Sequence, residues 1–486
     1  MIKFFIMMMA MLILFVACGR DGEHENISDV QLYEETLSPT NEPSPPVGEI
    51  IANSPGMELA WSTAQDFWDK FTTGDFSAAI QLMTAEMQTI IGEQTLQHTH
   101  QSILTNSGSF IKQPITLMDA NYVGGAYSFQ FMSLNTTAFS IYQMMVSDSG
   151  EVEAFWIIDS GFNPAPISDN ATFFVETITI GAGTPWALDG ALTMPNNASE
   201  SNPVPAVVLV HGSGAAAGDM DASLFNNRPF WDIAEHLSSN GIAVIRYHKR
   251  TFSHASALMQ TFPDNLTVWE ETVEDALLAA DILRNDTRID SDRIFMLGLS
   301  MGGMLAPRIH LEGGNFAGII LIGSTPESFT DTIVRQNLEF INTIEDDDMR
   351  NAFVDQLDAT IELFDALQYF TAEQARALPF DGGATFYYLR DFNMYSFKDL
   401  IDRVHIPFLI LHGERDYQTP AHVTIPLFEE IFSDRDNVTM YITPGLNHIL
   451  TPWNATGLNE VPGDATTLPN VTYESLRQIS NWILEQ

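Results

Sequence analysis

The sequence contains a single cysteine, Cys18, and few basic side chains among its 486 residues. One cysteine cannot form an internal disulfide, so no disulfide framework is expected. Only 21 Lys and Arg residues balance 63 Asp and Glu residues, which gives a formal net charge of −42. A chain this negative repels polyanions, which excludes nucleic acid as a partner.

The sequence also lacks the patterns that bind metals and nucleotides. His98 and His100 lie close together in "LQHTHQ", but no further ligand is near them in the sequence, so we expect surface histidines. The glycines of "GAGTP" and "GSGAAAG" are not followed by the Lys-Ser/Thr pair of a phosphate-binding loop. We therefore expect neither a metal nor a cofactor.

Hydrophobic residues make up 45% of the chain and aromatic residues 11%, as in a globular protein. Residues 1–17 carry one early lysine and then a long apolar run that ends in small residues, which predicts a signal peptide. Cys18 follows "FVA" directly, and this order resembles the lipobox of bacterial lipoproteins, in which the processed cysteine is lipidated. The resemblance implies export across the cytoplasmic membrane and a lipid anchor at the cell envelope. The alternative is an uncleaved membrane anchor.

The next two segments differ in composition. Residues 18–51 are acidic and rich in Ser, Pro, Asn and Thr, which predicts a solvated linker. Residues 52–165 begin with helical periodicity that breaks at Gly74, and strand-like alternation follows in "GAYSFQFMSL", "AFSIYQMMVS" and "VEAFWIID". This order predicts a small α+β domain. The turn "GDFSAAIQLM" and the closing "AFWIID" resemble the NTF2-like domain of some secreted bacterial enzymes, which implies a scaffold or binding module.

Residues 170–486 follow a different pattern. Apolar strands alternate with amphipathic helices through "AVVLVHGSG", "IAVIRYHKR", "RIFMLGLSMGG", "AGIILIGS", "PFLILHGERD" and "VTMYITPGLNH". This pattern predicts a mostly parallel sheet covered on both faces, that is, an α/β fold. The strand series pauses at about 325–402 for a largely helical insertion, which is expected to be either a cap over the ligand edge of the sheet or ordinary core packing.

Ser300 lies in Gly298-Leu-Ser300-Met-Gly302, which fits the Gly-X-Ser-X-Gly pattern of a nucleophile on a tight turn. The apolar segment before it is a strand and the segment after it begins a helix. A strand-turn-helix crossing raises the hydroxyl at the positive end of the helix. Ser300 is therefore the candidate nucleophile, and the alternative is an idle serine in a simple turn.

A serine nucleophile needs a histidine base and a carboxylate that orients the base. Two later strands end in such residues, because "PFLILHGERD" ends in Asp416 and "VTMYITPGLNH" ends in His448. The order Ser, acid, His is the one expected of this arrangement. Glu414 and His412 are rivals, but Glu414 lies closer to its strand and His412 lies inside it, so we favour Asp416 and His448.

Acyl transfer also needs donors for an oxyanion. The segment "HGSG", His211 to Gly214, follows an upstream strand, and we expect the backbone N–H groups of Ser213 and Met301 to be these donors. A flexible glycine loop is the alternative for "HGSG".

Together, "PAVVLVHGSG", "RYHKRT", "RIFMLGLSMGGMLAPRI", "LILHGERDYQ" and "LNH" resemble the secreted bacterial α/β-hydrolases that carry an N-terminal NTF2-like domain. These enzymes are related to dienelactone hydrolases and to serine aminopeptidase-type lipases. The resemblance implies a carboxylesterase with Ser300, Asp416 and His448 as its triad. Leu299 stands where relatives often have His, and His248 stands where they often have Asp.

The sequence leaves three functions open. The first is hydrolysis of a small-molecule ester through an acyl-enzyme on Ser300. The second is an exopeptidase or amidase with the same triad, because triad chemistry does not distinguish esters from amides. The third is a surface binding protein on an inactive hydrolase scaffold.

Overall fold

The computed structural model describes residues 55–107, 110, 116–123, 126–134, 139–160, 170–214, 228–342, 344, 347–380, 384–453 and 470–486. The expected signal peptide (1–17) and the whole of the expected linker (18–51), which begins with Cys18, lie outside them. Among the helices in these ranges, none is both long and apolar enough to span a bilayer.

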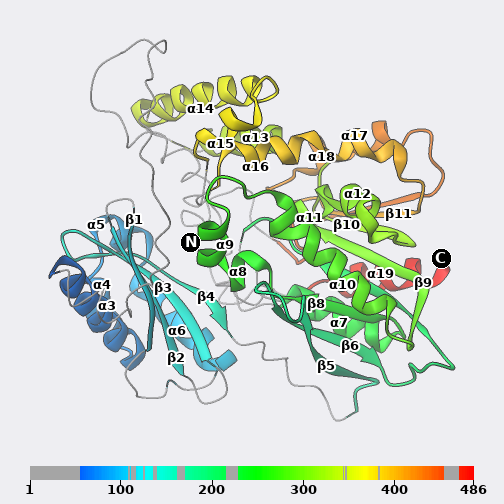
Figure 1. Ribbon diagram of the computed structural model, residues 1–486, viewed down its shortest axis with the longest axis horizontal. Coiled ribbons are helices and arrows are strands. Elements are labelled where there is room, and N and C mark those ends of the chain that lie inside the picture. Colours follow the sequence, from blue (N-terminus) through cyan, green and yellow to red (C-terminus); the bar gives the residue numbers. More distant parts are fainter. Residues whose placement is uncertain are drawn as a thin grey trace.

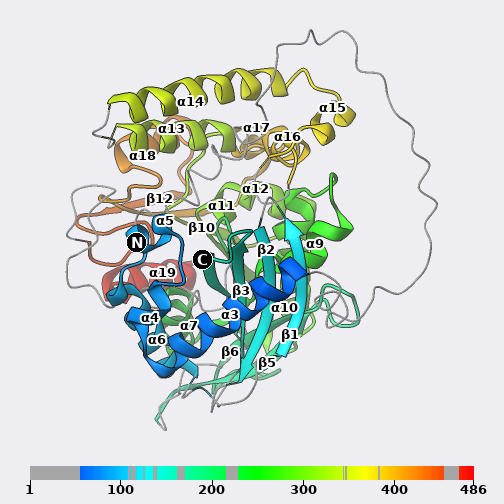
Figure 2. The same ribbon diagram turned by 90° about the vertical axis from the view of Figure 1, so that its left-hand side faces the viewer.

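The N-terminal unit packs helices against one antiparallel sheet. Its elements are α3 (Pro55–Thr73), α4 (Phe76–Ile80), α5 (Ala85–Ile90), α6 (Glu93–Ser107), β1 (Thr116–Val123), β2 (Ala126–Leu134), β3 (Phe139–Ser147) and β4 (Val152–Ser160). The strands pair in the order β1-β2-β3-β4, each antiparallel to its neighbour. Helix α3 lies across this sheet (Figure 2). Helices followed by consecutive strands are the predicted α+β arrangement.

Aromatic side chains form the core of this unit. The ring of Trp68 on α3 lies 4.4 Å from the ring of Tyr142 and 5.2 Å from that of Phe131, measured between centroids. The predicted break between the first two helices occurs at Gly74, whose φ of 84° is in the left-handed region that glycine tolerates. Asp75 then caps α4 by accepting a hydrogen bond from the N–H of Ala78.

Three elements of this unit were not predicted, namely α5, α6 and β1. Helix α6 carries few apolar residues, so its helical stripe is weak in the sequence. The expectation of a surface histidine is wrong for His100, which is partly buried on α6. Its ring lies 5.6 Å from that of Phe71 and 5.3 Å from that of Phe76, because it completes the aromatic core.

The second unit is built on an eight-stranded sheet in the order β12-β11-β10-β9-β7-β8-β6-β5. The strands are β5 (Phe173–Ile180), β6 (Leu188–Pro195), β7 (Val204–Val210), β8 (Ala243–Tyr247), β9 (Ile289–Leu299), β10 (Gly318–Ile322), β11 (Phe408–Gly413) and β12 (Val438–Thr443). β5 and β6 form an antiparallel hairpin and β6 is antiparallel to β8, whereas all other neighbours are parallel. This is the α/β-hydrolase fold class that the resemblance implied.

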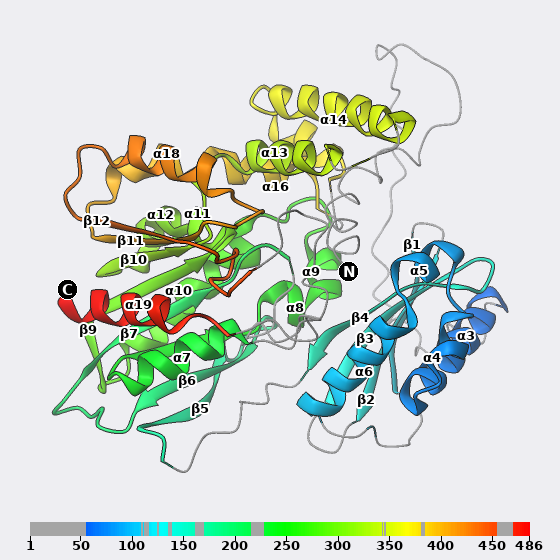
Figure 3. The same ribbon diagram turned by 180° about the vertical axis from the view of Figure 1, so that it is seen from behind.

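Helices cover both faces of this sheet, as continuous apolar strands require. Helices α7 (Pro229–Ser239) and α19 (Tyr473–Glu485) pack on one face, and α10 (Glu274–Arg284) packs on the other (Figures 1 and 3). The side chains of strand β7 alternate between the two faces. Val207 and Leu209 pack in the core beneath α7 and α19, whereas Val208 and Val210 pack in the core beneath α10.

The insertion predicted at about 325–402 is helical. It comprises α13 (Phe329–Ile341), α14 (Asp347–Leu367), α15 (Ala372–Ala377), α16 (Phe386–Met394), α17 (Phe397–Leu400) and a 3-10 turn, Ile401–Arg403. We call these elements the cap. Helices α13, α14 and α16 lie together beyond one edge of the sheet (Figure 3). A bidentate ion pair joins Arg308 to Asp391 of α16, with N–O distances of 2.7 and 3.2 Å.

The remaining short helices connect these elements. They are α8 (Arg250–Ser253), α9 (Ala255–Thr261), the π-helical turns η1 (Trp269–Val273) and η2 (His310–Gly314), α11 (Met301–Met304), α12 (Ala306–Ile309) and α18 (Ala421–Ile431).

Candidate active site

Ser300 occupies a strained turn between β9 and α11. Its φ of 52° and ψ of −120° are unusual for a residue with a side chain. The backbone N–H of Ser300 donates to the carbonyl of Ile322 at 2.9 Å, which fixes the turn against β10. Strain of this kind costs about 1–3 kcal/mol and is concentrated at functional sites.

The glycines on either side of Ser300 are required by close backbone contacts. A Cβ on Gly298 would lie 2.6 Å from the carbonyl carbon of Gly302. A Cβ on Gly302 would lie 2.6 Å from the carbonyl oxygens of both Val210 and His211. The Gly-X-Ser-X-Gly spacing therefore brings the turn directly against the end of β7.

Asp416 and His448 form a hydrogen-bonded pair after β11 and β12. The Nδ1 atom of His448 lies 2.8 Å from Oδ2 of Asp416, and both side chains are buried. Asp416 accepts further hydrogen bonds from the N–H groups of Gln418 (2.8 Å) and Thr419 (3.0 Å) and from the Thr419 hydroxyl (2.8 Å). Burial acts to raise the pKa of Asp416, but the charge and hydrogen bond of His448 outweigh it and keep that pKa below its usual value.

Ser300 and His448 lie at the same edge of the sheet. The N–H of Ser300 is bonded to Ile322, and the next residue, Gly323, touches His448. A Cβ on Gly323 would lie 2.8 Å from Nδ1 and 3.0 Å from Cε1 of His448. The carboxyl ends of β9, β10, β11 and β12 thus bring the three predicted side chains to one region.

The predicted oxyanion loop also adjoins Ser300. A Cβ on Gly212 would lie 3.1 Å from Cβ and 3.7 Å from Oγ of Ser300, so the backbone before Ser213 passes beside the hydroxyl. Met301 is the first residue of α11 and is buried. The N–H groups of Ser213 and Met301, the predicted donors, belong to the two backbone segments that border Ser300.

His211 fixes the start of this loop. Its Nε2 atom lies 2.7 Å from the carbonyl oxygen of Tyr247, and its ring stacks on Phe230 at 4.7 Å. Burial lowers the pKa of His211 to about 3, so the ring is neutral at physiological pH and donates this hydrogen bond.

The two rival residues are placed elsewhere. Glu414 accepts a hydrogen bond from the N–H of Gly445 at 3.0 Å and its side chain faces solvent. His412 lies inside β11, fully buried, with Nε2 2.5 Å from the carbonyl oxygen of Thr419. Its Nε2 also lies 3.5 Å from Oδ2 of Asp416, so it packs behind the acid.

Sequence reasoning missed several residues around the site. Thr419 donates two of the hydrogen bonds to Asp416, and Lys249, Glu271 and Tyr388 form a buried polar group next to the oxyanion loop. The only signal in the sequence was the run of basic residues in "RYHKR", which begins in the last two residues of β8. His248, in the same run, is buried with its ring 5.0 Å from that of Phe252.

No cluster of three or more His, Cys, Asp or Glu side chains arranged to hold a metal ion occurs among the described residues. The side chain of His98 lies outside the part of the chain that the structure describes.

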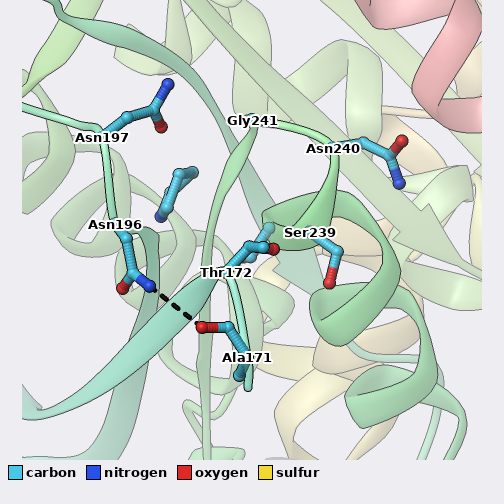
Figure 4. Close-up of a pocket in the computed structure, with 9 residues that line it drawn as sticks. Ala171, Thr172, Asn196, Asn197, Ser239, Asn240 and Gly241 are labelled. Atoms are coloured by element: carbon cyan, nitrogen blue, oxygen red, sulfur yellow. Dashed lines mark hydrogen bonds between the residues drawn. The ribbon is translucent and has the colours of Figure 1, made fainter.

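Figure 4 shows a pocket of about 640 Å³ whose lining contains none of the three predicted triad residues. It is lined by the segments Ala171–Thr172, Pro195–Asn197 and Ser238–Gly241. Because Thr193 of β6 pairs with Val244 at the start of β8, this pocket borders the amino ends of the parallel strands. Ser300, Asp416 and His448 follow the carboxyl ends, so the pocket is not part of the candidate active site.

The chain is similar to known hydrolases in both sequence and structure. A model of the alpha/beta hydrolase family matches residues 207–459, a range that contains Ser300, Asp416 and His448. Esterase EstD of Thermotoga maritima is 31% identical over 320 residues, which cover 65% of this chain and 69% of that protein. The structure of Est1E from Butyrivibrio proteoclasticus is 16% identical, covers 64% of this chain and 99% of its own, and has a TM-score of 0.40. The structure of the acylaminoacyl peptidase of Pyrococcus horikoshii is 15% identical, and the match covers 70% of this chain and 47% of that chain with a TM-score of 0.36.

Proposed function

Because this chain belongs to the alpha/beta hydrolase family, we propose that it cleaves carboxylic esters of small molecules through a Ser300-His448-Asp416 triad. The observation that carries the proposal is the 2.8 Å hydrogen bond between His448 and a buried Asp416, at the sheet edge where Ser300 stands on a strained turn. The similarity to a protein named as an esterase supports the choice of substrate class.

In the first half of the reaction, the Oγ atom of Ser300 attacks the acyl carbon while Nε2 of His448 takes its proton. The carbonyl π electrons move onto oxygen, and the resulting oxyanion accepts hydrogen bonds from the N–H groups of Ser213 and Met301. The tetrahedral intermediate then collapses. The C–O bond to the alcohol breaks, His448 returns the proton to the departing alkoxide, and an acyl ester remains on Ser300.

In the second half, water attacks the acyl-enzyme and gives its proton to His448, which then returns it to Ser300 as the carboxylic acid leaves. Asp416 stays ionised throughout. Its hydrogen bond to Nδ1 holds the proton on that nitrogen, so Nε2 is free to act as the base.

An ester panel tests this proposal. Purified protein should hydrolyse short p-nitrophenyl esters, and a fluorophosphonate probe should label the wild type but not Ser300→Ala. Aminoacyl anilides measured beside the esters distinguish an amidase. Anilide cleavage without ester turnover would refute the esterase, and equal labelling of the two proteins would exclude Ser300 as the nucleophile.

We also propose that the mature chain is tethered to the cell envelope by lipid on Cys18, which is supported by the signal-like segment 1–17 that precedes it. Labelled palmitate should be incorporated into the wild type and not into Cys18→Ala. Equal incorporation would contradict the anchor.

The α+β unit is proposed to be an NTF2-like scaffold or binding module outside the chemistry. Its support is the four-stranded antiparallel sheet with α3 across it.

A further inference from the structure

A buried chain of polar side chains connects the loop beside Ser300 to the cap. The Nζ atom of Lys249 donates to the carbonyl oxygen of Gly212 at 2.9 Å and forms an ion pair with Oε1 of Glu271. The other carboxylate oxygen, Oε2, accepts a hydrogen bond from the hydroxyl of Tyr388 at 2.5 Å. Lys249 follows strand β8, and Glu271 lies in the π-helical turn η1. Tyr388 lies on cap helix α16. We call this the Lys249–Glu271–Tyr388 chain.

Stability alone does not explain a buried ion pair at this point. The side chains of Lys249 and Glu271 are 2% and 8% exposed, so both charges have lost nearly all of their hydration. Removing two charges from water costs several kcal/mol each, and apolar side chains of the same size are often as stabilising. The other hydrogen bonds of the pair, from Lys249 to Gly212 and from Tyr388 to Glu271, therefore indicate what the pair holds in position.

The hydrogen bond to Gly212 fixes the orientation of one peptide group. No cis peptide bond occurs among the described residues, so the carbonyl of Gly212 and the N–H of Ser213 point in opposite directions from the same planar group. When Lys249 holds the carbonyl on one side, the N–H of Ser213 is held on the other. This peptide adjoins Ser300, since a Cβ on Gly212 would lie 3.1 Å from Cβ of Ser300.

A cationic donor also changes the strength of that N–H group. A hydrogen bond to the carbonyl oxygen polarises the peptide and makes its N–H a better donor, and the effect is larger where water is excluded. The Lys249 contact would thus act on both the direction and the strength of one proposed oxyanion donor.

The cap end of the chain contacts the second proposed donor residue. The hydroxyl of Tyr388 lies 3.7 Å from Sδ of Met301, in addition to its hydrogen bond to Glu271. Tyr388 itself is anchored within the cap, where its ring lies 6.4 Å from that of Phe392. Tyr388 is therefore linked to the peptide before Ser213 through Glu271 and Lys249, and it contacts Met301 directly.

We propose that Lys249, Glu271 and Tyr388 are positioning residues that set the geometry of the oxyanion hole and make it depend on the position of the cap. The inference rests on the proposed function, because it concerns how the tetrahedral intermediate of ester cleavage is stabilised. None of the three side chains is assigned contact with the substrate.

The main test replaces Lys249 with methionine, which keeps the chain length and removes the donor. A misplaced oxyanion donor should lower kcat for a short p-nitrophenyl ester by about 10²-fold, with KM changed by less than about threefold. A trifluoromethyl ketone adds to the serine as a tetrahedral oxyanion, so its Ki should rise by a factor similar to the loss in kcat. A merely structural role would not move kcat and the ketone Ki together at constant KM.

Three further variants separate positioning from folding. Tyr388→Phe removes only the hydroxyl and should lower kcat and weaken the ketone by about 3- to 10-fold. Glu271→Gln offers an oxygen to Lys249 and an N–H to Tyr388, so it should retain more activity than Glu271→Leu at equal thermal stability. Tyr388→Phe decides the question if Lys249→Met does not fold.

The matched control is Arg308→Met. It removes another poorly exposed ion pair to α16, that with Asp391, at a point that does not contact Gly212. It should lower thermal stability and leave the ketone Ki near that of the wild type. If folded Lys249→Met and Tyr388→Phe both keep kcat and the ketone Ki within about twofold of wild type, the inference is overturned. If the wild type neither turns over esters nor reacts with fluorophosphonate, the proposed function has failed instead.

Discussion

Replacing Asp416 with asparagine should abolish most of the activity by changing which nitrogen of His448 carries the proton. In the wild type, Oδ1 of Asp416 accepts from the N–H groups of Gln418 and Thr419, and Oδ2 accepts from His448 and from the Thr419 hydroxyl. The two backbone donors cannot turn away. The single oxygen of asparagine must therefore occupy the Oδ1 position, and its NH₂ group must face His448.

An NH₂ group that faces Nδ1 can only be satisfied if Nδ1 accepts a hydrogen bond. The proton of His448 then moves to Nε2, the nitrogen that must take the proton of Ser300. The variant retains the shape of the site but presents the wrong tautomer of its base. The expected loss in kcat is about 10⁴-fold, which corresponds to about 5 kcal/mol of transition-state stabilisation at 1.36 kcal/mol per factor of ten.

The assay is steady-state hydrolysis of a short p-nitrophenyl ester, with thermal unfolding measured in parallel. Glu414→Gln is the matched control, since Glu414 lies two residues away and its carboxylate accepts a hydrogen bond from the N–H of Gly445, which an amide oxygen can also accept. It should keep kcat within about twofold of the wild type. A folded Asp416→Asn variant with kcat within tenfold of wild type would refute the tautomer argument, as would equal losses in the two variants.

Three further predictions follow from other contacts. Burial lowers the pKa of His211 to about 3, from 6.5 in the unfolded chain, so the stability that the neutral ring contributes is complete above pH 6.5 and is lost as the pH falls. Between pH 7.5 and 5, the free energy of unfolding of the wild type should therefore fall by about 2 kcal/mol more than that of His211→Gln, as measured by urea titration. Equal losses in the two proteins would contradict this prediction. Gly323→Ala should lower kcat by at least about 10²-fold, because the new Cβ would lie 2.8 Å from Nδ1 of His448. The φ of 53° at this position is also unfavourable for alanine. An unchanged kcat would be inconsistent with this crowding. Trp68→Ala should destabilise the N-terminal unit by about 3–5 kcal/mol, seen by calorimetry, while a parallel fall in ester kcat would argue against a separate role for that unit.

The sequence was sufficient to group the three proposed catalytic side chains because each follows a strand. Apolar segments mark the strands, and parallel strands bring their carboxyl ends to one edge, so Ser300, Asp416 and His448 could be grouped without coordinates. The choice of Asp416 over Glu414 agrees with the observed hydrogen bond to His448. The topology of a parallel sheet was therefore enough to group these residues, without any distance between them.

The polar chain to the cap could not be predicted in this way. Lys249, Glu271 and Tyr388 come from a loop, a π-helical turn and a cap helix, and no sequence periodicity relates the three. Glu271 falls in "WEETVEDA", where an acidic residue on a helix normally faces solvent. The body of the domain pairs Lys249 with Glu271, and the packing of the cap against it adds the hydroxyl of Tyr388.

The cap contacts the acid side of the site as well as the oxyanion side. The side chain of Gln336 on α13 donates to the carbonyl oxygen of Gln418 at 2.8 Å, and Arg335 reaches the same oxygen at 3.3 Å. The N–H of Gln418 in turn donates to Asp416 at 2.8 Å. Helix α13 therefore contacts the segment that follows Asp416, and helix α16 contacts Met301, which follows Ser300. A substrate group that shifts the cap would change the geometry of both, so acyl preference in this enzyme should be expressed in kcat as well as in KM.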